Sequence, residues 1–137
     1  RALKRMEDHA DGLFYLGLCY LHKGDVTAGI EKIETALAMN PRLQYGRPYL
    51  QLARYYEEQV NDKEALHSLH RGDEAGISTA EMEYYRGKIL QKLGHTAEAE
   101  AAFNSAIQYF RTAPKYLKKD SRRWAILARL AKLKGMR

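Results

Sequence analysis

Apolar and small residues recur every three or four positions in two neighbouring stretches near the start of the chain, a spacing that places them on one face of a helix. The first stretch holds Leu13, Leu16, Gly17 and Tyr20, and the second holds Gly29, Ile33 and Ala36. Gly24 and Asp25 separate the two stretches, and Pro41 follows the second. Gly17 and Gly29 fall in the helix interiors, where glycine costs roughly 1 kcal/mol relative to alanine. The pattern therefore predicts a helical hairpin whose two helices approach closely at these glycines.

The same pattern returns later in the chain. Its small residue recurs at intervals of 36, 34 and 41 residues, at Gly17, Ala53, Gly87 and Ala128. A lone hairpin of this kind cannot bury its apolar face, so copies are expected to stack on one another. The predicted repeats span about 10–43, 46–79 and 80–113, followed by a last helix at about 121–135.

These repeats resemble the tetratricopeptide repeat (TPR), whose pattern is W-x2-L-G-x2-Y…A-x3-F…P with a period of about 34 residues. Leu13, Gly29 and Ile33 stand in the Trp, Ala and Phe positions of the first repeat. The resemblance covers nearly the whole chain. It implies an all-α fold, a right-handed α-solenoid of antiparallel helical hairpins, as a single domain over 1–137. Departures are Arg86 in the Leu position and Gly72 in the third small position of the second repeat; no proline closes the third repeat.

Local signals predict where the helices begin and end. Asp25 and Asn61 are suited to N-cap positions, and Ser78–Glu81 has the form of a capping box. Residues 1–9 either extend the first helix backward or end a preceding element. Residues 113–121 are predicted to be the longest irregular connection, with Tyr116 and Leu117 packed beneath it.

The last helix has an apolar face made of Trp124, Leu127, Ala128 and Ala131. We expect this face to pack on the preceding helix. Because the end of a repeat array needs a polar outer surface, we expect the other face, with Arg123 and Lys134, to be solvated.

Composition limits the classes of protein to which the chain can belong. At 137 residues, with 45% hydrophobic content, it suits one folded domain and excludes a disordered chain. No stretch approaches the roughly 20 apolar residues of a membrane span, and no signal peptide is visible. Since the first residue is Arg1, we expect a segment of a longer protein. The expected location is cytoplasmic, with membrane contact only through a region outside this chain.

The net charge of +6 is unevenly distributed. Residues 1–110 hold 13 Lys/Arg and 16 Asp/Glu, a net charge of −3, whereas residues 111–137 hold 10 Lys/Arg and Asp120, a net charge of +9. Such asymmetry bears on partners rather than on the fold.

No motif for catalysis is found in the sequence. The nucleophile elbow, P-loop, HExxH and dinucleotide-binding patterns are all missing. His67 and His70 lie three residues apart on a predicted helix but lack a third ligand, and the single cysteine, Cys19, cannot form an intramolecular disulfide. We therefore expect no enzyme activity, no cofactor and no metal.

The resemblance implies that the first helix of each hairpin lines a concave surface, so we compared equivalent positions of these helices. The position after the small residue holds Leu18, Arg54, Lys88 and Arg129, and the position one turn earlier holds Phe14, Leu50, Tyr84 and Ala125. Further turns hold Arg47, Glu81 and Arg122 on one side and Glu57, Gln91 and Lys132 on the other. The comparison predicts a partly basic groove, made of an apolar row beside a cationic row. Phe14 and Leu18 replace the Lys and Asn of the clamp that binds chaperone C-termini, which disfavours those partners.

The leading hypothesis is a scaffold that binds a peptide or partner protein with acidic groups in this groove. One alternative is that the basic C-terminal segment binds nucleic acid or an anionic membrane surface, with Tyr116 and Trp124 as stacking rings, although Trp124 falls in a core position. A second alternative is self-association through an exposed apolar patch on the last helix. The segment 113–130 also resembles the ends of some bacterial TPR proteins that carry a short N-terminal membrane anchor.

Overall fold

The computed structural model describes the backbone of residues 2–135 and the side chains of residues 5 and 8–135. Within that range the regular structure is entirely helical, which confirms the all-α prediction. The elements are α1 (Ala2–His22), α2 (Val26–Met39), a short 3₁₀ helix η1 (Leu43–Gly46), α3 (Arg47–Glu58), α4 (Asp62–Glu74), α5 (Ala80–Lys92), α6 (Thr96–Thr112) and α7 (Lys115–Gly135).

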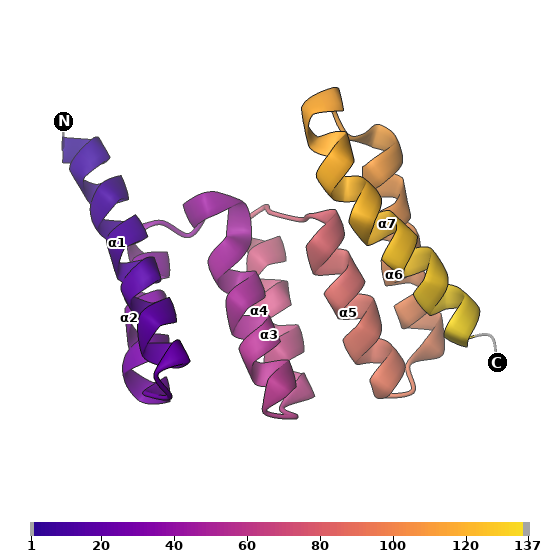
Figure 1. Cartoon of the computed structure of the whole chain (residues 1–137), viewed down its shortest axis with the longest axis horizontal. Helices are drawn as coiled ribbons and strands as arrows, with labels where there is room; N and C mark the ends of the chain where they lie inside the picture. Colours follow the sequence, from indigo (N-terminus) through magenta and orange to yellow (C-terminus); the bar gives the residue numbers. More distant parts are fainter. Residues whose placement is uncertain (1, 136–137) are drawn as a thin grey trace.

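The helices are arranged as consecutive pairs (Figure 1). Each of α1, α3 and α5 packs mainly against the helix that follows it, giving three hairpins in a row. The last helix, α7, lies against both α5 and α6, as expected of a helix that covers the end of the third hairpin. No described helix is long and apolar enough to cross a membrane.

The first hairpin confirms the close approach predicted from its glycines. A Cβ atom on Gly17 would lie 2.8 Å from the carbonyl oxygen of Gly29 and 2.7 Å from Cγ1 of Ile33. Such distances are shorter than real Cβ contacts, so only glycine lets the two backbones meet at this crossing.

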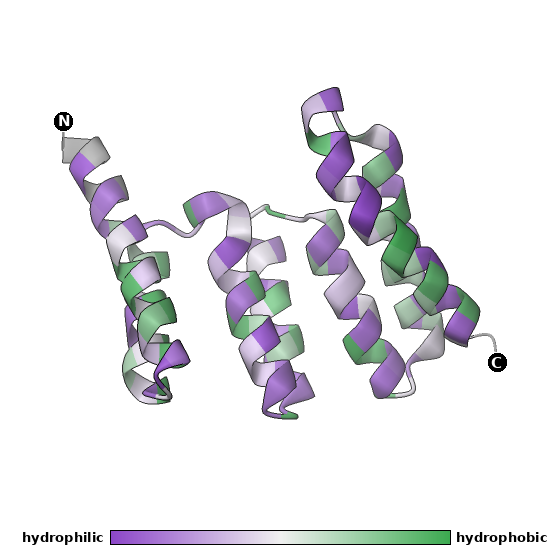
Figure 2. Ribbon diagram, viewed as in Figure 1, coloured by the Kyte–Doolittle hydropathy of each residue, from purple (hydrophilic) through white to green (hydrophobic). Residues whose placement is uncertain are grey.

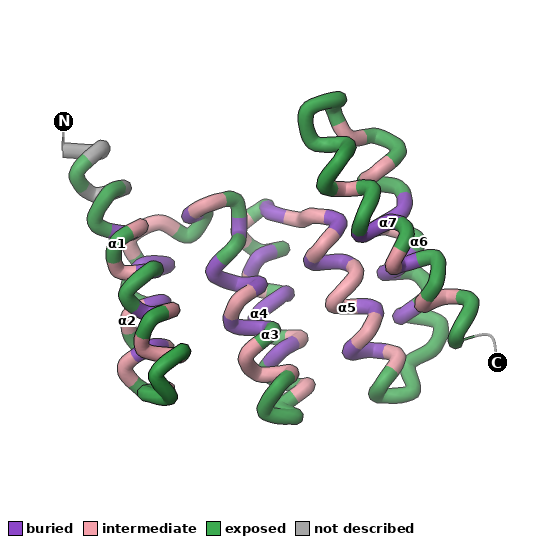
Figure 3. Tube along the Cα trace, viewed as in Figure 1, coloured by how far each residue is buried: buried purple, intermediate pink, exposed green. Residues whose placement is uncertain are grey.

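Three clusters of buried side chains follow one another along the chain, and Figure 3 shows the buried segments on the helix faces that meet. The first cluster is centred on Phe14, Ile33 and Leu52, which are completely buried between the first two hairpins. Leu69 and Ile89 belong to the second cluster, and the third surrounds Phe103 and Ala128. Burial of these residues supplies most of the stabilisation of the fold, at roughly 25 cal/mol per Å² of apolar surface.

Polar contacts join neighbouring hairpins. The guanidinium of Arg71 donates to both carboxylate oxygens of Glu34, at 2.7 and 2.8 Å, which links α4 to α2. Arg86, which stands where the repeat pattern expects leucine, donates to Asp73 at 2.6 Å and also pairs with Glu83. The departure from the apolar pattern at this position thus provides an ion pair between α5 and α4.

The structure decides between the two alternatives for the start of α1 and corrects the predicted start of α5. Residues 2–9 are helical, so α1 extends backward from about residue 10. The N-cap of α5 is Thr79, whose hydroxyl accepts from the Met82 amide at 3.1 Å, rather than a box formed by Ser78 and Glu81. Ser78 instead donates to Glu83 at 3.2 Å. Because either hydroxyl could cap the helix, the sequence pattern alone did not choose between adjacent residues.

The prediction of an irregular connection at 113–121 is also wrong. Helix α7 begins at Lys115, and Tyr116 and Leu117 are 83% and 44% exposed rather than packed beneath a loop. Pro114 ends the preceding structure, and the residues after it include no further proline or glycine before Gly135. With no breaker in that stretch, the helix starts immediately after the proline.

The outer face of α7 differs from the solvated, charged surface that we expected. Ile126, Leu130 and Leu133 are 49%, 58% and 62% exposed there. Figure 2 shows the corresponding change along α7, from mostly hydrophilic in its first half to hydrophobic in its second half. The charged residues of this helix border an aliphatic stripe rather than covering the whole face.

Candidate functional site

Three aromatic rings from two helices meet beside α3. Tyr84 and Tyr85 of α5 lie with their ring centroids 5.5 and 5.8 Å from that of Trp124 on α7. We call these three residues the ring cluster. Tyr84 also contacts Phe103 of the core, at 6.2 Å between centroids, so the cluster rests on a rigid base.

Cationic side chains lie over these rings. Arg54 of α3 has its guanidinium carbon 5.7 Å from the Tyr85 centroid, and the Lys88 ammonium is 5.6 Å from Tyr84. Arg123 lies 5.1 Å from the ring centroid of Trp124. Cation–π attraction of this kind contributes about 0.5–1 kcal/mol at exposed positions. It holds three cations from three helices on one surface, which we call the cation–ring face.

Within the described part of the chain, the cations of this face are not paired with carboxylates, unlike Arg71, Arg86 and Lys92. Among the residues that the structure describes, Arg54, Lys88 and Arg123 have no carboxylate oxygen within 4.0 Å. By contrast, Arg71, which links two hairpins, is paired with Glu34. The charged hydrogen-bond donors of the cation–ring face are therefore available to a ligand.

Glu81 is an acidic group that interacts with two of these cations, Arg54 and Arg123. Burial raises the pKa of its carboxyl above the ordinary value, and the nearby charge of Asp120 raises it further. Arg54 and Arg123 act in the opposite direction and lower that pKa in part. Burial likewise raises the pKa values of the Tyr84 and Tyr85 hydroxyls, so both remain neutral donors at physiological pH.

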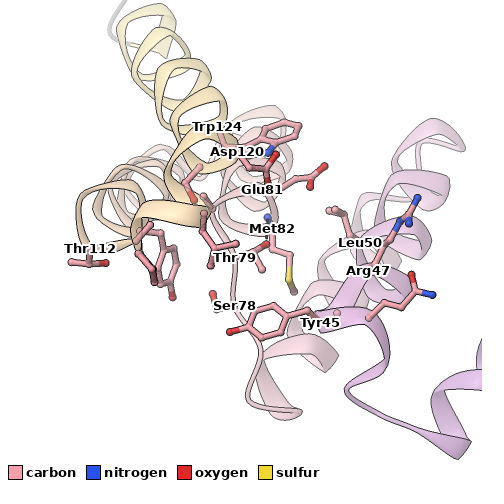
Figure 4. Close-up of a pocket in the computed structure, with 18 residues that line it drawn as sticks. Tyr45, Arg47, Leu50, Ser78, Thr79, Glu81, Met82, Thr112, Asp120 and Trp124 are labelled. Carbon is pink, nitrogen blue, oxygen red and sulfur yellow. Dashed lines mark hydrogen bonds between the residues drawn. The ribbon is translucent and has the colours of Figure 1, made fainter. Parts of the chain in front are cut away.

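A pocket of about 460 Å³ opens at one end of the cation–ring face (Figure 4). It lies between η1, the beginnings of α3 and α5, and the connection from α6 to α7. Its apolar lining includes Leu50, Met82, Tyr109, Leu117 and Trp124, and its polar lining includes Ser78, Thr79, Glu81 and Asp120. An apolar pocket with a few polar groups at its edge is the usual form of a site that holds one side chain or a small ligand.

Trp124 forms one wall of the pocket and has an unusual feature. The residue is only 8% exposed, and its indole Nε1 is buried with no hydrogen-bond partner among the described residues. Buried indole N–H groups usually find an acceptor. Because the ring is almost completely buried, it is not available for stacking with a base, as the nucleic-acid alternative would require.

The backbone bend of η1 positions Tyr45, which forms another part of the pocket wall. Gln44 and Tyr45 have positive φ angles of 46° and 57°, and Gly46 follows with a φ of 88°. Left-handed backbone at non-glycine residues is strained. The Tyr45 side chain, 67% exposed, is held at the mouth of the pocket by this bend.

The structure brings together part of the predicted groove. Arg54, Tyr84 and Lys88 lie on the cation–ring face, and Arg47 lies further along, 5.9 Å from the ring centroid of Phe14. Phe14 itself is completely buried and belongs to the core rather than to an accessible surface.

Several other predicted groove residues have different roles. Leu50 is 6% exposed and Leu18 packs against the first core cluster. Glu57 lies 3.8 Å from Lys92, and Gln91 donates to the carbonyl of Ala131 at 3.1 Å. Each of these side chains therefore makes contacts with other parts of the same chain.

Arg122 and Arg129 are exposed but do not join the cation–ring face. At 100° per residue they project roughly 160° and 140° away from Trp124, which faces α5. The helix begins earlier than predicted, and its packing face contains Trp124 and Ala128, as the sequence pattern predicts. Arg123 takes the place that we assigned to these two arginines.

The groove predicted from the sequence did not include Tyr85, Arg123 or Trp124. The paired tyrosines at 84 and 85 were a visible signal, because adjacent residues on a helix lie 100° apart and cannot both face the hairpin core. Trp124 was assigned to the core, and its burial agrees with that assignment, but it also forms a wall of the pocket.

The described residues hold no group of three His, Cys, Asp or Glu side chains placed to bind a metal ion. His70, one of the two histidines considered as ligands, lies 3.0 Å from Glu74 on the same helix. Protein-family models, curated proteins and solved structures were all compared with the chain, and none of them matches it.

Proposed function

We propose that this chain is a TPR-like scaffold, a right-handed α-solenoid that binds an extended, acidic segment of a partner protein on its cation–ring face. The support for the architecture is the row of three helical hairpins and the small residues at their crossings. The proposal assigns the chain no catalytic step, cofactor or metal.

The observation that carries the proposal is the set of unpaired cations over rings. Arg54, Lys88 and Arg123 are held by aromatic faces and, within the described chain, are not neutralised by carboxylates. Guanidinium groups bind carboxylates in a two-point geometry, and a lysine ammonium adds a point charge. Preorganisation by the rings lowers the entropy lost when a ligand binds.

The pocket beside this face suits one apolar side chain of the same segment. Its volume of about 460 Å³ and its apolar lining provide room for a leucine, methionine or phenylalanine. Tyr45 at the mouth would cover the side chain once it is inserted. A matching segment therefore has two or three carboxylates and one large apolar residue.

The test uses fluorescein-labelled peptides in which a single phenylalanine is flanked by aspartates, and fluorescence anisotropy as the readout. We expect the wild-type chain to bind them and the variant Arg54→Glu/Lys88→Glu to bind about tenfold or more weakly, because two attractive charges become repulsive. The same peptides with asparagine in place of aspartate should also bind weakly.

The control is Lys63→Glu/Arg111→Glu, which makes the same change of net charge at exposed positions on α4 and α6. If this control weakens peptide binding as much as Arg54→Glu/Lys88→Glu does, the peptide is attracted by the overall charge of the protein and the proposed site is wrong. Equal binding by wild type and Arg54→Glu/Lys88→Glu, with unchanged helicity, also contradicts it.

A further inference from the structure

The outer face of α7 has an aliphatic stripe that nothing in the described chain covers. Ile126, Leu130 and Leu133 follow one another at intervals of four and three residues, which aligns them along about 10 Å of the helix. All three are roughly half exposed or more, whereas Trp124 and Ala128 on the opposite face are buried against α5 and α6 (Figure 3).

Cations border this stripe on both sides. Arg122 and Arg129 lie along one edge and Lys134 along the other, at the angles given by the helical period. All three are exposed. The one acidic residue of α7, Asp120, lies away from the stripe and lines the pocket. The outer face is therefore apolar and positive, with no anion of its own.

Three kinds of occupant have the complementary charge. Nucleic acid is disfavoured because stacking with bases requires exposed aromatic rings, whereas the stripe is aliphatic and Trp124 is buried. An acidic helix of a partner protein binds best in a hydrophobic groove, whereas the stripe runs along one convex helix. A bilayer with anionic headgroups is deformable and suits a single convex helix that combines apolar residues with flanking cations.

We propose that the outer face of α7 binds the surface of anionic lipid bilayers. The three aliphatic side chains enter the boundary between headgroups and acyl chains, and the flanking Arg and Lys side chains extend to the lipid phosphates. α7 lies parallel to the bilayer plane and does not cross it. The inference does not depend on the proposed peptide site, because the stripe faces away from α5 and the ring cluster.

The test is co-sedimentation of the whole chain with large vesicles, either of phosphatidylcholine alone or with about 30% phosphatidylserine, a fraction that gives the negative surface potential of an anionic leaflet. We expect binding to the anionic vesicles, little binding to neutral ones, and a loss of binding at high salt. The variant Ile126→Asp/Leu130→Asp should bind the anionic vesicles about tenfold or more weakly, and Arg122→Gln/Arg129→Gln should show a smaller loss.

The matched control is Val60→Asp/Leu93→Asp, which also places two acids at exposed apolar residues, 79% and 44% exposed after α3 and α5. It should bind vesicles like the wild type. All substituted side chains are solvent-exposed, so we expect every variant to fold. Circular dichroism of each variant checks that a loss of binding is not caused by a loss of folding.

Two results would overturn the inference. The first is no sedimentation of the wild-type chain with anionic vesicles at low salt, whether or not the chain shifts an oligonucleotide or elutes as a dimer. The second is equal sedimentation of wild type and Ile126→Asp/Leu130→Asp, which would show that the aliphatic stripe takes no part. Peptide binding by the cation–ring face is measured separately, so failure of one assay leaves the other result standing.

Discussion

The ring of Phe103 occupies the space in which a side chain at residue 87 would begin. A Cβ atom on Gly87 would lie 2.5 Å from Cε1 and 2.6 Å from Cδ1 of that ring. Both residues are buried where α5 crosses α6, directly beneath Tyr84. The position of the cation–ring face therefore depends on the absence of a side chain at residue 87.

Gly87→Ala is expected to destabilise the protein by about 1–3 kcal/mol, because the added methyl forces the Phe103 ring or the α5 backbone to move. Urea unfolding followed by circular dichroism measures the change. The control is Gly12→Ala on α1, where a Cβ meets no atom within 4 Å and where alanine should stabilise the helix by a few tenths to 1 kcal/mol. Equal stability of the Gly87 variant and the wild type would show that the crossing is looser than described.

Gln91→Ala should release the C-terminal turns of α7. The Gln91 amide donates to the Ala131 carbonyl at 3.1 Å, and a hydrogen bond of this type contributes about 1 kcal/mol. We expect amide hydrogen exchange in residues 126–135 to become about fivefold faster, without a change elsewhere. Gln108→Ala, at an exposed position on α6, is the control. Unchanged exchange in α7 would mean that α7 is held by apolar contacts alone.

Tyr84→Ala should expose the indole of Trp124, because the two rings lie 5.5 Å apart. Trp124 is the single tryptophan of the chain, so its fluorescence reports on this site directly. We expect emission at longer wavelength and a loss of stability of about 1–2 kcal/mol. Tyr116→Ala, on the same helix but at a residue that is 83% exposed, should leave the emission unchanged. Identical spectra for wild type and Tyr84→Ala would contradict the ring cluster.

Glu81→Gln tests the electrostatics of the cation–ring face. Burial and Asp120 raise the pKa of Glu81 in the folded protein above 4.5, so the unfolded chain loses this proton first as pH rises. The free energy of unfolding of the wild type therefore decreases as pH rises from the unfolded-state pKa of Glu81 to its higher folded-state pKa. Glutamine does not titrate, so this loss of stability is missing from the variant. The melting temperature of the variant minus that of the wild type should therefore increase between about pH 4 and pH 7.

A difference in melting temperature that stays constant over this pH range would contradict the raised pKa. Asp120→Asn is a useful companion variant, since it removes the second cause of the shift. It should reduce the pH dependence of the wild type without abolishing it, because burial is the larger cause.

Local signals in the sequence were sufficient to predict the boundaries of α2. The helix Val26–Met39 begins directly after Asp25, the predicted N-cap, which accepts from the Ala28 amide, and it ends two residues before Pro41. Such signals are local, because each depends on residues within one or two turns. The close crossing of Gly17 and Gly29 was also predictable, since glycine inside a helix is unfavourable unless space is short.

The composition of the candidate site was less predictable. Equivalent positions in successive helices identified Arg54, Tyr84 and Lys88, but the same rule placed Phe14 on the surface, where the structure buries it completely. A position in a repeat specifies a direction around its own helix. Whether a side chain there meets solvent depends on how near the next hairpin lies.

The sequence by itself determined that the chain is helical, where most of its helices begin and end, and which small residues permit close crossings, because these follow from backbone preferences over a few residues. The predicted packing face of α7 already contained Trp124, but only the tertiary structure decided that this ring meets α5 and that Ile126, Leu130 and Leu133 stay in solvent. The rotation of a helix about its axis is set by its packing against α5 and α6, elements that the local pattern of α7 does not contain.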